Sequence, residues 1–251
     1  MKSESTPLVT IDQANAGGAY TGAENLEVMK EALNYNRYLL DLIVEHAANA
    51  KRIVDFGAGN GTFAVPVAQA GFDVTAVELD DSLRAHLAGV GLAVAAGAAE
   101  IPAATFDYAY TLNVLEHITE DVAALKVLRA ALKPGARLLV YVPAFPVLYT
   151  SMDSKVGHVR RYTRETLSSS VTAAGFELER VEYADSIGFF ASLVFRLTDR
   201  GTGNVNPRML KIYDRLVFPI SRVLDRLTRG WFGKNLVLVA RNPAASPGSR
   251  V

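Results

Sequence analysis

Short apolar runs, separated by segments with helical spacing, fill the middle of the chain. The runs predict strands at 52–57, 72–79, 92–96, 106–113 and 136–143, and the segments between them predict helices at 61–70, 80–88 and 119–132. Short apolar strands that alternate with helices are typical of βαβ units, in which a parallel sheet carries helices on both faces. The pattern therefore predicts an α/β fold with a doubly wound sheet.

Further elements flank this block. Apolar residues at helical spacing from Leu26 to Val44 predict one or two helices ahead of the sheet. After it we expect a helix at 164–174 and strands at 176–184 and 234–241, with an insertion of helices at 186–198 and 207–228 that Pro219 interrupts or kinks. We assign 22–241 to one domain, 185–232 to a helical lid, and the aperiodic segments 1–21 and 242–251 to flexible ends.

Composition narrows the function. The 251 residues include 26 basic and 26 acidic side chains and no cysteine, so nothing draws the whole chain to nucleic acid, and thiolate chemistry is excluded. The opening segment MKSESTPLVTIDQANAGGAY lacks the apolar core of a signal peptide. We expect a cytoplasmic protein that is a monomer or homodimer and that binds any anion locally.

A glycine-rich turn follows the first strand, in VDFGAGNG. Gly57, Gly59 and Gly61 permit positive φ and close approach of a ligand to the backbone. Asp55 suits a ligand with an ammonium group better than a pyrophosphate, and the G-x-G-x-G spacing lacks the third glycine of the dinucleotide motif. Glu78, at 78 − 57 = 21 residues beyond Gly57, can accept both hydroxyls of a ribose. Without a ligand, the same residues would be a strand-to-helix turn with two helix-capping acids.

In VDFGAGNG, VTAVELD, FDYAYTLNVLEHI and LKPGARLLVYVP, the chain resembles class I S-adenosylmethionine-dependent methyltransferases. The resemblance covers 50–184 and the last strand. It implies a Rossmann-like sheet with a late antiparallel strand, S-adenosylmethionine as donor, S-adenosylhomocysteine as product and no metal. It also implies that Asp55 and the glycine backbone hold the methionine end, Glu78 the ribose, Leu79 one adenine face and Asn113 the far side of the donor.

The adenine end departs from the family pattern. Ala98 stands where the family usually has an acid, so that contact would come from the backbone or from Glu100. The complete set of predicted donor-binding residues is Asp55, Gly57, Ala58, Gly59, Gly61, Glu78, Leu79, Ala99 and Asn113.

Candidate catalytic residues follow the fourth strand, in NVLEHI. Glu116 and His117 offer a carboxylate and an imidazole that can take a proton from an acceptor oxygen. A similar dipeptide is common in the family and frequently structural, so that alternative stays open. If the acceptor atom is an isoprenoid alkene carbon, the rings of Tyr20, Tyr35 or Tyr149 would stabilise a cation, and we count Tyr35 among the catalytic candidates.

The loop after the fifth strand is long and rich in donors, in GHVRRYT. We predict that an anionic acceptor contacts Tyr20, Tyr149, His158, Arg160, Arg161 and Tyr162. Adjacent residues of an extended loop point in opposite directions, so we expect one arginine to pair with Asp153 or Glu165 and the other to face the ligand. The loop resembles a bacterial methyltransferase branch with a PAFP…GHxRRY segment, seen near glycosyl- and isoprenoid-lipid pathways. That resemblance implies an acceptor with a phosphate, diphosphate or carboxylate and an apolar part.

The segment 207–228 combines a basic stripe with an apolar face. Such a helix can lie on a membrane, cover a greasy substrate, or pack on the sheet with its cations in water. Three functions compete with the first hypothesis: methylation of a natural product or sugar without phosphate, a non-catalytic donor-binding partner subunit, and a nucleotide-dependent oxidoreductase. The glycine spacing and Asp55 disfavour the last.

Overall fold

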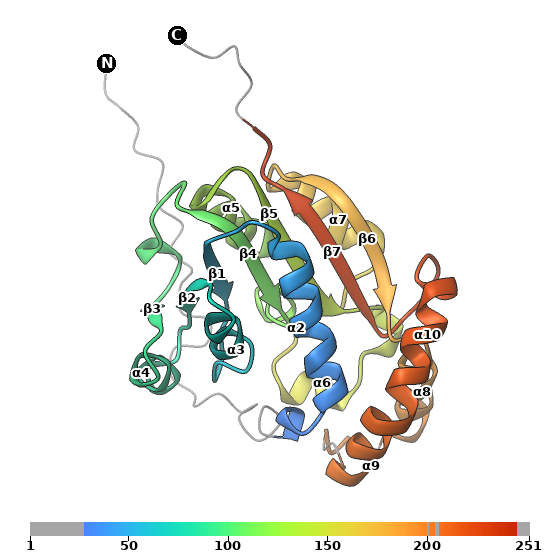
Figure 1. The fold of residues 1–251 in the computed structure, drawn as a ribbon. Coiled ribbons are helices and arrows are strands. Elements are labelled where there is room, and N and C mark those ends of the chain that lie inside the picture. Colours follow the sequence, from blue (N-terminus) through green and yellow to red (C-terminus); the bar gives the residue numbers. More distant parts are fainter. Residues whose placement is uncertain (1–27, 200, 204–205, 245–251) are drawn as a thin grey trace.

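Seven strands form one sheet in the computed structural model, which describes residues 28–199, 201–203 and 206–244 (Figure 1). Their order is β3-β2-β1-β4-β5-β7-β6, and β7 runs antiparallel to both of its neighbours while the other pairs are parallel. The strands are β1 (Arg52–Phe56), β2 (Asp73–Val77), β3 (Ala93–Ala95), β4 (Phe106–Leu112), β5 (Leu132–Pro143), β6 (Glu177–Ala184) and β7 (Asn235–Arg241). The predicted doubly wound sheet with a late antiparallel strand is confirmed.

Helices cover both faces of this sheet. α5 (Asp121–Ala131) and α7 (Arg164–Ala173) pack on one face, while α2 (Leu33–Ala47) and α3 (Ala64–Gln69) pack on the other (Figure 1). α4 (Asp81–Gly89) connects β2 to β3 and buries Leu87 in the α2 side of the core. The predicted helix ahead of the sheet is therefore present as α2.

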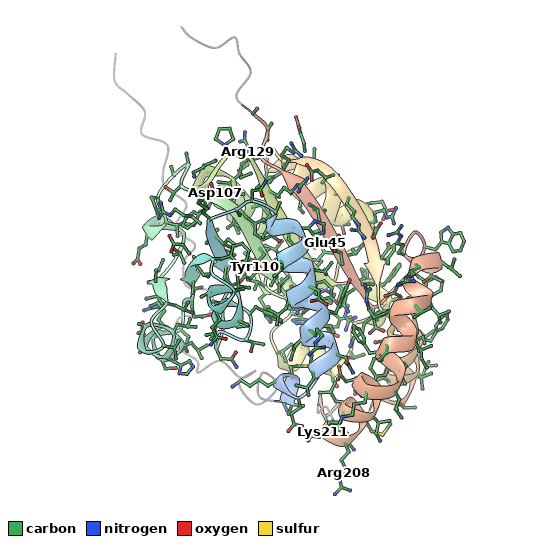
Figure 2. All side chains as sticks on the ribbon, viewed as in Figure 1. Glu45, Asp107, Tyr110, Arg129, Arg208 and Lys211 are labelled. Carbon is green, nitrogen blue, oxygen red and sulfur yellow. The ribbon has the colours of Figure 1, made fainter. Side chains whose placement is uncertain are left out.

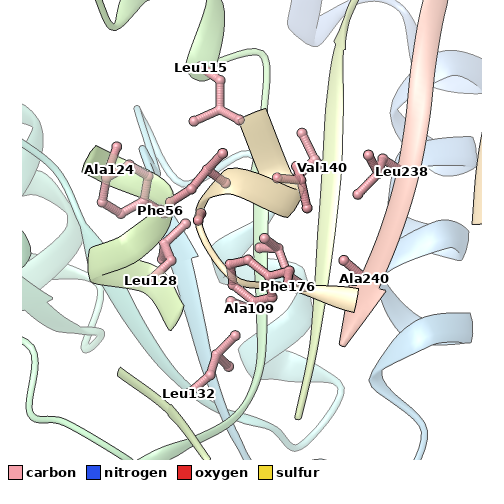
Figure 3. Close-up of a cluster of buried hydrophobic side chains, with 14 of the residues drawn as sticks. Phe56, Ala109, Leu115, Ala124, Leu128, Leu132, Val140, Phe176, Leu238 and Ala240 are labelled. Atoms are coloured by element: carbon pink, nitrogen blue, oxygen red, sulfur yellow. The ribbon is translucent and has the colours of Figure 1, made fainter. Parts of the chain in front are cut away.

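The α5 and α7 side of the core is one cluster of buried aliphatic and aromatic side chains. Leu128 of α5, Val140 of β5 and Leu238 of β7 are each 0% exposed and belong to one apolar cluster (Figure 3). Burying a leucine side chain contributes about 1.5 to 3 kcal/mol, and truncating one to alanine in a packed core costs about 2 to 5 kcal/mol. This layer fixes the strands whose carboxyl ends carry the candidate site.

The insertion between β6 and β7 is helical, as predicted. It consists of α8 (Ser186–Thr198), α9 (Pro207–Ile212), a π-helical turn (Tyr213–Val217) and α10 (Phe218–Thr228). Asn206 caps α9 by accepting hydrogen bonds from the next two free amides, and Pro207 occupies the first helical position. Pro219 lies in the first turn of α10, where a proline fits without breaking the helix. The irregularity expected near Pro219 is present as the π turn, which ends at Val217.

Two buried acids attach the insertion to the rest of the protein. Asp214, 2% exposed, accepts hydrogen bonds from the backbone amides of Asn34 and Tyr35 at 3.0 and 2.9 Å, and so caps the start of α2. Asp225, 4% exposed, accepts two more from amides at the start of α8, at 2.9 and 2.8 Å. Free amides at a helix start carry partial positive charge, so each carboxylate stabilises the helix that it contacts.

No helix in the described ranges has the length and apolar character needed to cross a membrane. The predicted flexible segment 1–21 and residues 245–251 of the predicted tail lie outside the described residues. The role of 185–232 as a lid stays a prediction.

Candidate active site

The strand order reverses between β1 and β4, because β2 and β3 lie on one side of this pair and β5 on the other. Ligands of open α/β sheets bind outside the carboxyl ends of the strands at such a point. The turn at 57–61 follows β1 and the segment at 113–117 follows β4, so two predicted groups meet here.

Two glycines of the turn, Gly57 and Gly59, differ in the space that a side chain would have. Gly57 has φ +84°, and a Cβ there would lie 2.4 Å from a methyl carbon of Val114, so close packing excludes a side chain. Gly59 has φ +55°, but a Cβ there would meet no atom within 4 Å. The backbone at Gly59 therefore faces open space that a ligand can occupy.

Glu78 is fixed beside that space. Its Oε2 accepts a hydrogen bond from the Gly59 amide at 2.8 Å, and its Oε1 accepts one from the Asp80 amide at 2.9 Å. A carboxylate oxygen can accept more than one hydrogen bond, so acceptor capacity remains for two hydroxyl groups. Next to it, Leu79 leaves 68% of its surface exposed, an apolar face that an aromatic ring would cover.

Asp55 lies deeper, at the end of β1, and is 3% exposed. Burial raises its pKa to about 7, although the hydrogen bond from the Tyr110 hydroxyl (2.9 Å to Oδ2) lowers it, and the negative charge of Glu78 adds to the rise. A ligand ammonium group would stabilise the ionised form. The sequence did not identify Tyr110 (Figure 2), which is opposite Asp55 in the β1–β4 register.

Asn113 and Tyr35 are brought together at the end of β4. Asn113 adopts φ +55°, which asparagine tolerates better than most residues, and its Nδ2 donates to the Tyr35 hydroxyl at 3.5 Å. The Tyr35 ring packs edge-on against Tyr141 and Phe218, with centroids 6.1 and 5.7 Å away, and burial raises its pKa to about 12. Tyr35 is thus a neutral phenol at physiological pH.

The remaining predicted donor residues surround this turn. Gly61 is in the left-handed region at φ +82°, Ala58 is buried, and Ala99 is exposed in the 3₁₀ turn after β3. The Glu100 carboxylate, considered for the adenine contact, accepts a hydrogen bond from the Ala96 amide at 2.7 Å. It stabilises the end of β3 in this structure.

Glu116 and His117 lie with His158 in one cluster. Glu116 is 0% exposed, neither carboxylate oxygen has a hydrogen-bond partner among the described residues, and burial raises its pKa to about 8. His158 Nε2 is 3.8 Å from Glu116 Oε1, and the rings of His117 and His158 are 4.7 Å apart at their centroids. One possible ligand atom from each lies within 4.8 Å of the others, so these three residues are the candidates for holding a metal.

His117 is the more accessible of the two predicted bases. It is half-buried, and burial lowers its pKa to about 4, assisted by the nearby His158 and opposed by a hydrogen bond with the Gly157 backbone. At neutral pH, the His117 imidazole is therefore uncharged, with a pKa of about 4 that makes it a weak base, whereas Glu116 is mostly protonated.

Asp153 organises the long loop. Its Oδ1 lies 2.7 Å from His158 Nδ1, and its two oxygens accept hydrogen bonds from Arg161 Nε and Nη2 at 2.8 and 3.0 Å. Burial would raise the Asp153 pKa, but the hydrogen bonds from His158 and Arg161 outweigh it and hold the pKa well below its usual range. The expected pairing of one arginine with Asp153 is present, and the arginine is Arg161.

Two predicted acceptor ligands turn inward, which corrects the prediction for them. Arg161 is 7% exposed and its guanidinium is occupied by Asp153. Tyr162 is 1% exposed, and its hydroxyl lies 2.8 Å from Asp121 Oδ2 and 3.1 Å from the Leu115 carbonyl oxygen. Both residues hold the loop against the sheet, so neither presents a free polar group to an acceptor.

The other predicted acceptor ligands are placed differently. Arg160 is 34% exposed at its side chain and donates to the Thr119 carbonyl at 2.6 Å, with Asp121 Oδ2 3.4 Å away. The Tyr149 hydroxyl donates to the His158 carbonyl at 2.6 Å. Tyr20 lies outside the described residues. Arg160 is therefore the loop arginine that remains open to solvent.

This sheet order defines a Rossmann-like fold, with the glycine turn and the acids Asp55 and Glu78 at the carboxyl ends of its first two strands. The profile of the methyltransferase domain family matches residues 28–181, more than half of the chain, and the chain belongs to this family. Two ubiquinone biosynthesis O-methyltransferases, from Stutzerimonas stutzeri (strain A1501) and Caulobacter sp. (strain K31), are each 30% identical over 115 and 99 residues. These matches cover 41% and 36% of this chain and 49% and 39% of the relatives, so the chain spans half or less of their length.

Solved structures show the same fold. A Thermotoga maritima S-adenosylmethionine-dependent methyltransferase, a possible histamine N-methyltransferase, matches with TM-score 0.59 and 18% identity, covering 89% of this chain and 97% of its own. The Burkholderia thailandensis 1,6-didemethyltoxoflavin-N1-methyltransferase, with bound S-adenosylhomocysteine, matches with TM-score 0.57 and 17% identity over 89% and 84%. The [4+2]-cyclase SpnF matches with TM-score 0.55 and 22% identity over 84% and 82%. The fold therefore occurs with more than one chemistry, and the function must be argued from the site.

Proposed function

We propose that this protein is an enzyme that transfers the methyl group of S-adenosylmethionine to a small-molecule acceptor. The observation that carries the proposal is the open space at Gly59, bordered by the fixed Glu78 carboxylate, at the point where the sheet order reverses. When bound there, the donor supplies an electrophilic methyl group on a sulfonium, and its product is S-adenosylhomocysteine.

The residues at this point fit the parts of that donor. Glu78 has capacity for the ribose hydroxyls, and the exposed Leu79 offers an apolar face for the adenine. Asp55, with its pKa raised to about 7, gains a partner in the ammonium group. Asn113, at the end of β4, would contact the side of the donor opposite Glu78.

For an oxygen acceptor, the proposed base is His117. It is uncharged at neutral pH and half-buried, whereas the Glu116 carboxyl is inaccessible and mostly protonated. The proton of the acceptor hydroxyl would pass to His117 as the oxygen attacks. The two curated relatives support oxygen as the acceptor atom, since both are named as O-methyltransferases.

The proposed acceptor is anionic with an apolar part, such as an isoprenoid or a lipid-linked intermediate. Arg160 supports the anion because its side chain is partly exposed, at 34%, beside its contacts with Thr119 and Asp121. Phe189, Phe190 and Phe232 support the apolar part, since their rings form a cluster with centroids 5.3 to 5.6 Å apart at the base of the insertion. The name of the curated relatives supports an isoprenoid acceptor.

The test combines binding with turnover. Calorimetry should detect S-adenosylhomocysteine binding, and labelled donor should methylate at least one member of a panel of phosphorylated isoprenoids, lipid-linked sugars and small carboxylates. The panel includes each compound without its phosphate, so a preference for the anion is measured directly. Donor binding without turnover on any member would favour a non-catalytic subunit, and no donor binding would refute the cofactor assignment.

A further inference from the structure

The insertion exposes an unusual amount of apolar surface. Twelve of the nineteen exposed large hydrophobic side chains in the described part of the chain belong to it or to the turn that follows. They are Phe190, Val194, Phe195, Leu197, Met209, Ile212, Leu216, Ile220, Val223, Leu224, Leu227 and Trp231. Single exposed apolar residues are ordinary, but such a concentration marks an interaction surface.

Apolar side chains of the π-helical turn and α10 form a stripe. Leu216, Ile220, Val223 and Leu227 follow steps of four, three and four, and are 65%, 58%, 60% and 76% exposed. The opposite side of the same helix is buried, at Phe218, Ser221 and Asp225. The helix therefore packs on the protein with one side and presents an unpartnered apolar side outward.

The charges beside this stripe are all positive where they are exposed. The acids of the segment 206–231 are Asp214 and Asp225, and both are buried as caps for α2 and α8. The exposed cations of the same segment are Arg208, Lys211, Arg215, Arg226 and Arg229.

Some of these cations are already paired. Lys211 pairs with Glu31 at 2.7 Å and Arg229 with Glu182 at 3.2 Å. Arg208, Arg215 and Arg226 form no ion pair with any described acid, and Figure 2 shows Arg208 extending from the outer end of the insertion.

We infer that this face binds the surface of a membrane that contains anionic lipids. The apolar stripe would enter the boundary between headgroups and acyl chains, while the arginines reach lipid phosphates. Trp231, 75% exposed in the turn after α10, has the amphipathic ring that favours this boundary. The inference does not depend on the proposed methyl transfer, because it concerns a surface outside the donor site.

Charge favours a membrane over a second copy of the chain. In a symmetric dimer the same patch meets itself, so the arginines of one copy would approach those of the other. The described part of the segment has no exposed acid to pair with them. An anionic bilayer instead offers phosphate partners for every cation.

The single tryptophan of the chain makes the test direct. Full-length protein is mixed with vesicles of phosphatidylcholine alone or of phosphatidylcholine with phosphatidylglycerol, and Trp231 emission and co-sedimentation are measured. We expect a blue shift and binding with the anionic vesicles, weakened by salt. Arg215→Gln combined with Arg226→Gln should weaken binding about tenfold or more, since each cation near such a surface contributes about 1 kcal/mol.

A matched pair of variants separates the stripe from general hydrophobicity. Leu227→Gln should weaken vesicle binding, while Val44→Gln, which changes an exposed residue of α2, should not. S-adenosylhomocysteine affinity reports that each variant is folded. If the parent protein itself does not bind S-adenosylhomocysteine, that result counts against the proposed function and leaves the membrane inference standing. Equal binding to both kinds of vesicle, or a dimer in light scattering that Leu227→Gln dissociates without any vesicle binding, would overturn the inference.

Discussion

Arg161 donates two hydrogen bonds to Asp153, at 2.8 and 3.0 Å, and both side chains are buried within the long loop. We predict that Arg161→Ala lowers the free energy of unfolding by about 3 kcal/mol, because it removes the arginine of a buried ion pair and leaves the Asp153 carboxylate with only His158 and Thr150 as partners. Arg160→Ala is the matched control and should cost about 1 kcal/mol or less, since its ion pair is partly exposed. Urea unfolding measures both, and equal losses would show that the loop arginines have been given the wrong roles.

Arg160→Ala has a second expected effect, on the acceptor. If its partly exposed guanidinium contacts an anionic group, the variant should raise the acceptor KM about tenfold and leave donor affinity unchanged. Steady-state kinetics with an acceptor from the panel, and calorimetry with S-adenosylhomocysteine, measure the two quantities. Loss of donor affinity instead would place the loop on the donor side.

Glu78→Ala should weaken S-adenosylhomocysteine binding about tenfold or more. A hydrogen bond to a charged group contributes about 1.5 to 3 kcal/mol, and the carboxylate also fixes the Gly59 amide. Glu100→Ala is the comparison, because Glu100 contacts the Ala96 amide, and its effect on affinity should be smaller. Calorimetry at constant pH measures both, and unchanged affinity in Glu78→Ala would remove the donor assignment.

The pH dependence of turnover identifies the base. If His117 accepts the proton, its pKa of about 4 leaves it unprotonated across the neutral range, so kcat/KM for the acceptor, measured at saturating donor, should stay level from pH 6 to 8. If Glu116 is the base, kcat/KM should instead rise toward a pKa of about 8. His117→Gln should lower kcat about 100-fold or more without changing donor affinity.

A chelator distinguishes proton transfer from metal binding in the same cluster. Because we assign His117 to proton transfer, turnover should survive treatment with EDTA. Activity that disappears with EDTA and returns with one divalent metal would show that Glu116, His117 and His158 bind a metal.

Stability should also depend on pH through Glu116. Its folded pKa of about 8 lies above the unfolded value of about 4.3, so the stability contributed by the protonated form is full below that lower value and is lost as the pH rises through 8. Glu116→Gln cannot ionise and should gain roughly 3 to 4 kcal/mol relative to the parent protein between pH 5 and pH 8, since each pH unit in this window is worth about 1.4 kcal/mol. Urea unfolding at both pH values measures the difference, and Glu100→Gln serves as the exposed control.

The two glycines of the turn should respond differently to alanine. Gly57→Ala should destabilise the fold by about 3 kcal/mol, because its Cβ would meet Val114 at 2.4 Å and φ is positive. Gly59→Ala should cost about 1 to 2 kcal/mol but weaken S-adenosylhomocysteine about tenfold, since its Cβ would enter the open space. Adding Val114→Ala to Gly57→Ala should recover part of the stability, and no recovery would contradict the steric explanation.

The sequence predicted the sheet well, because local signals determine its strands, and the same signals mark the glycine turn. Strand periodicity and the glycine turn require no knowledge of distant contacts, and Asp55 and Glu78 follow from their places at strand ends. The loop roles depend on contacts across the fold. No local pattern shows that Asp153 forms its ion pair with Arg161 and not with Arg160. Nor does one show that the Tyr162 hydroxyl forms a hydrogen bond with Asp121 of α5. The sequence predicted the helices of the insertion. It did not show that Asp214 and Asp225 are buried, because their partners are the backbone amides at the starts of α2 and α8.

The hydrogen bonds from Asn34 and Tyr35 to Asp214 connect residues about 180 positions apart. An insertion is often regarded as a cassette that can be exchanged between homologues, but this one supplies the cap of α2. A chimera that receives only 185–232 from this protein would place the Asp214 carboxylate against the first turn of another protein's helix. A chimera that lacks 185–232 would leave α2 without its cap. The two segments must therefore be inherited, or engineered, as a pair.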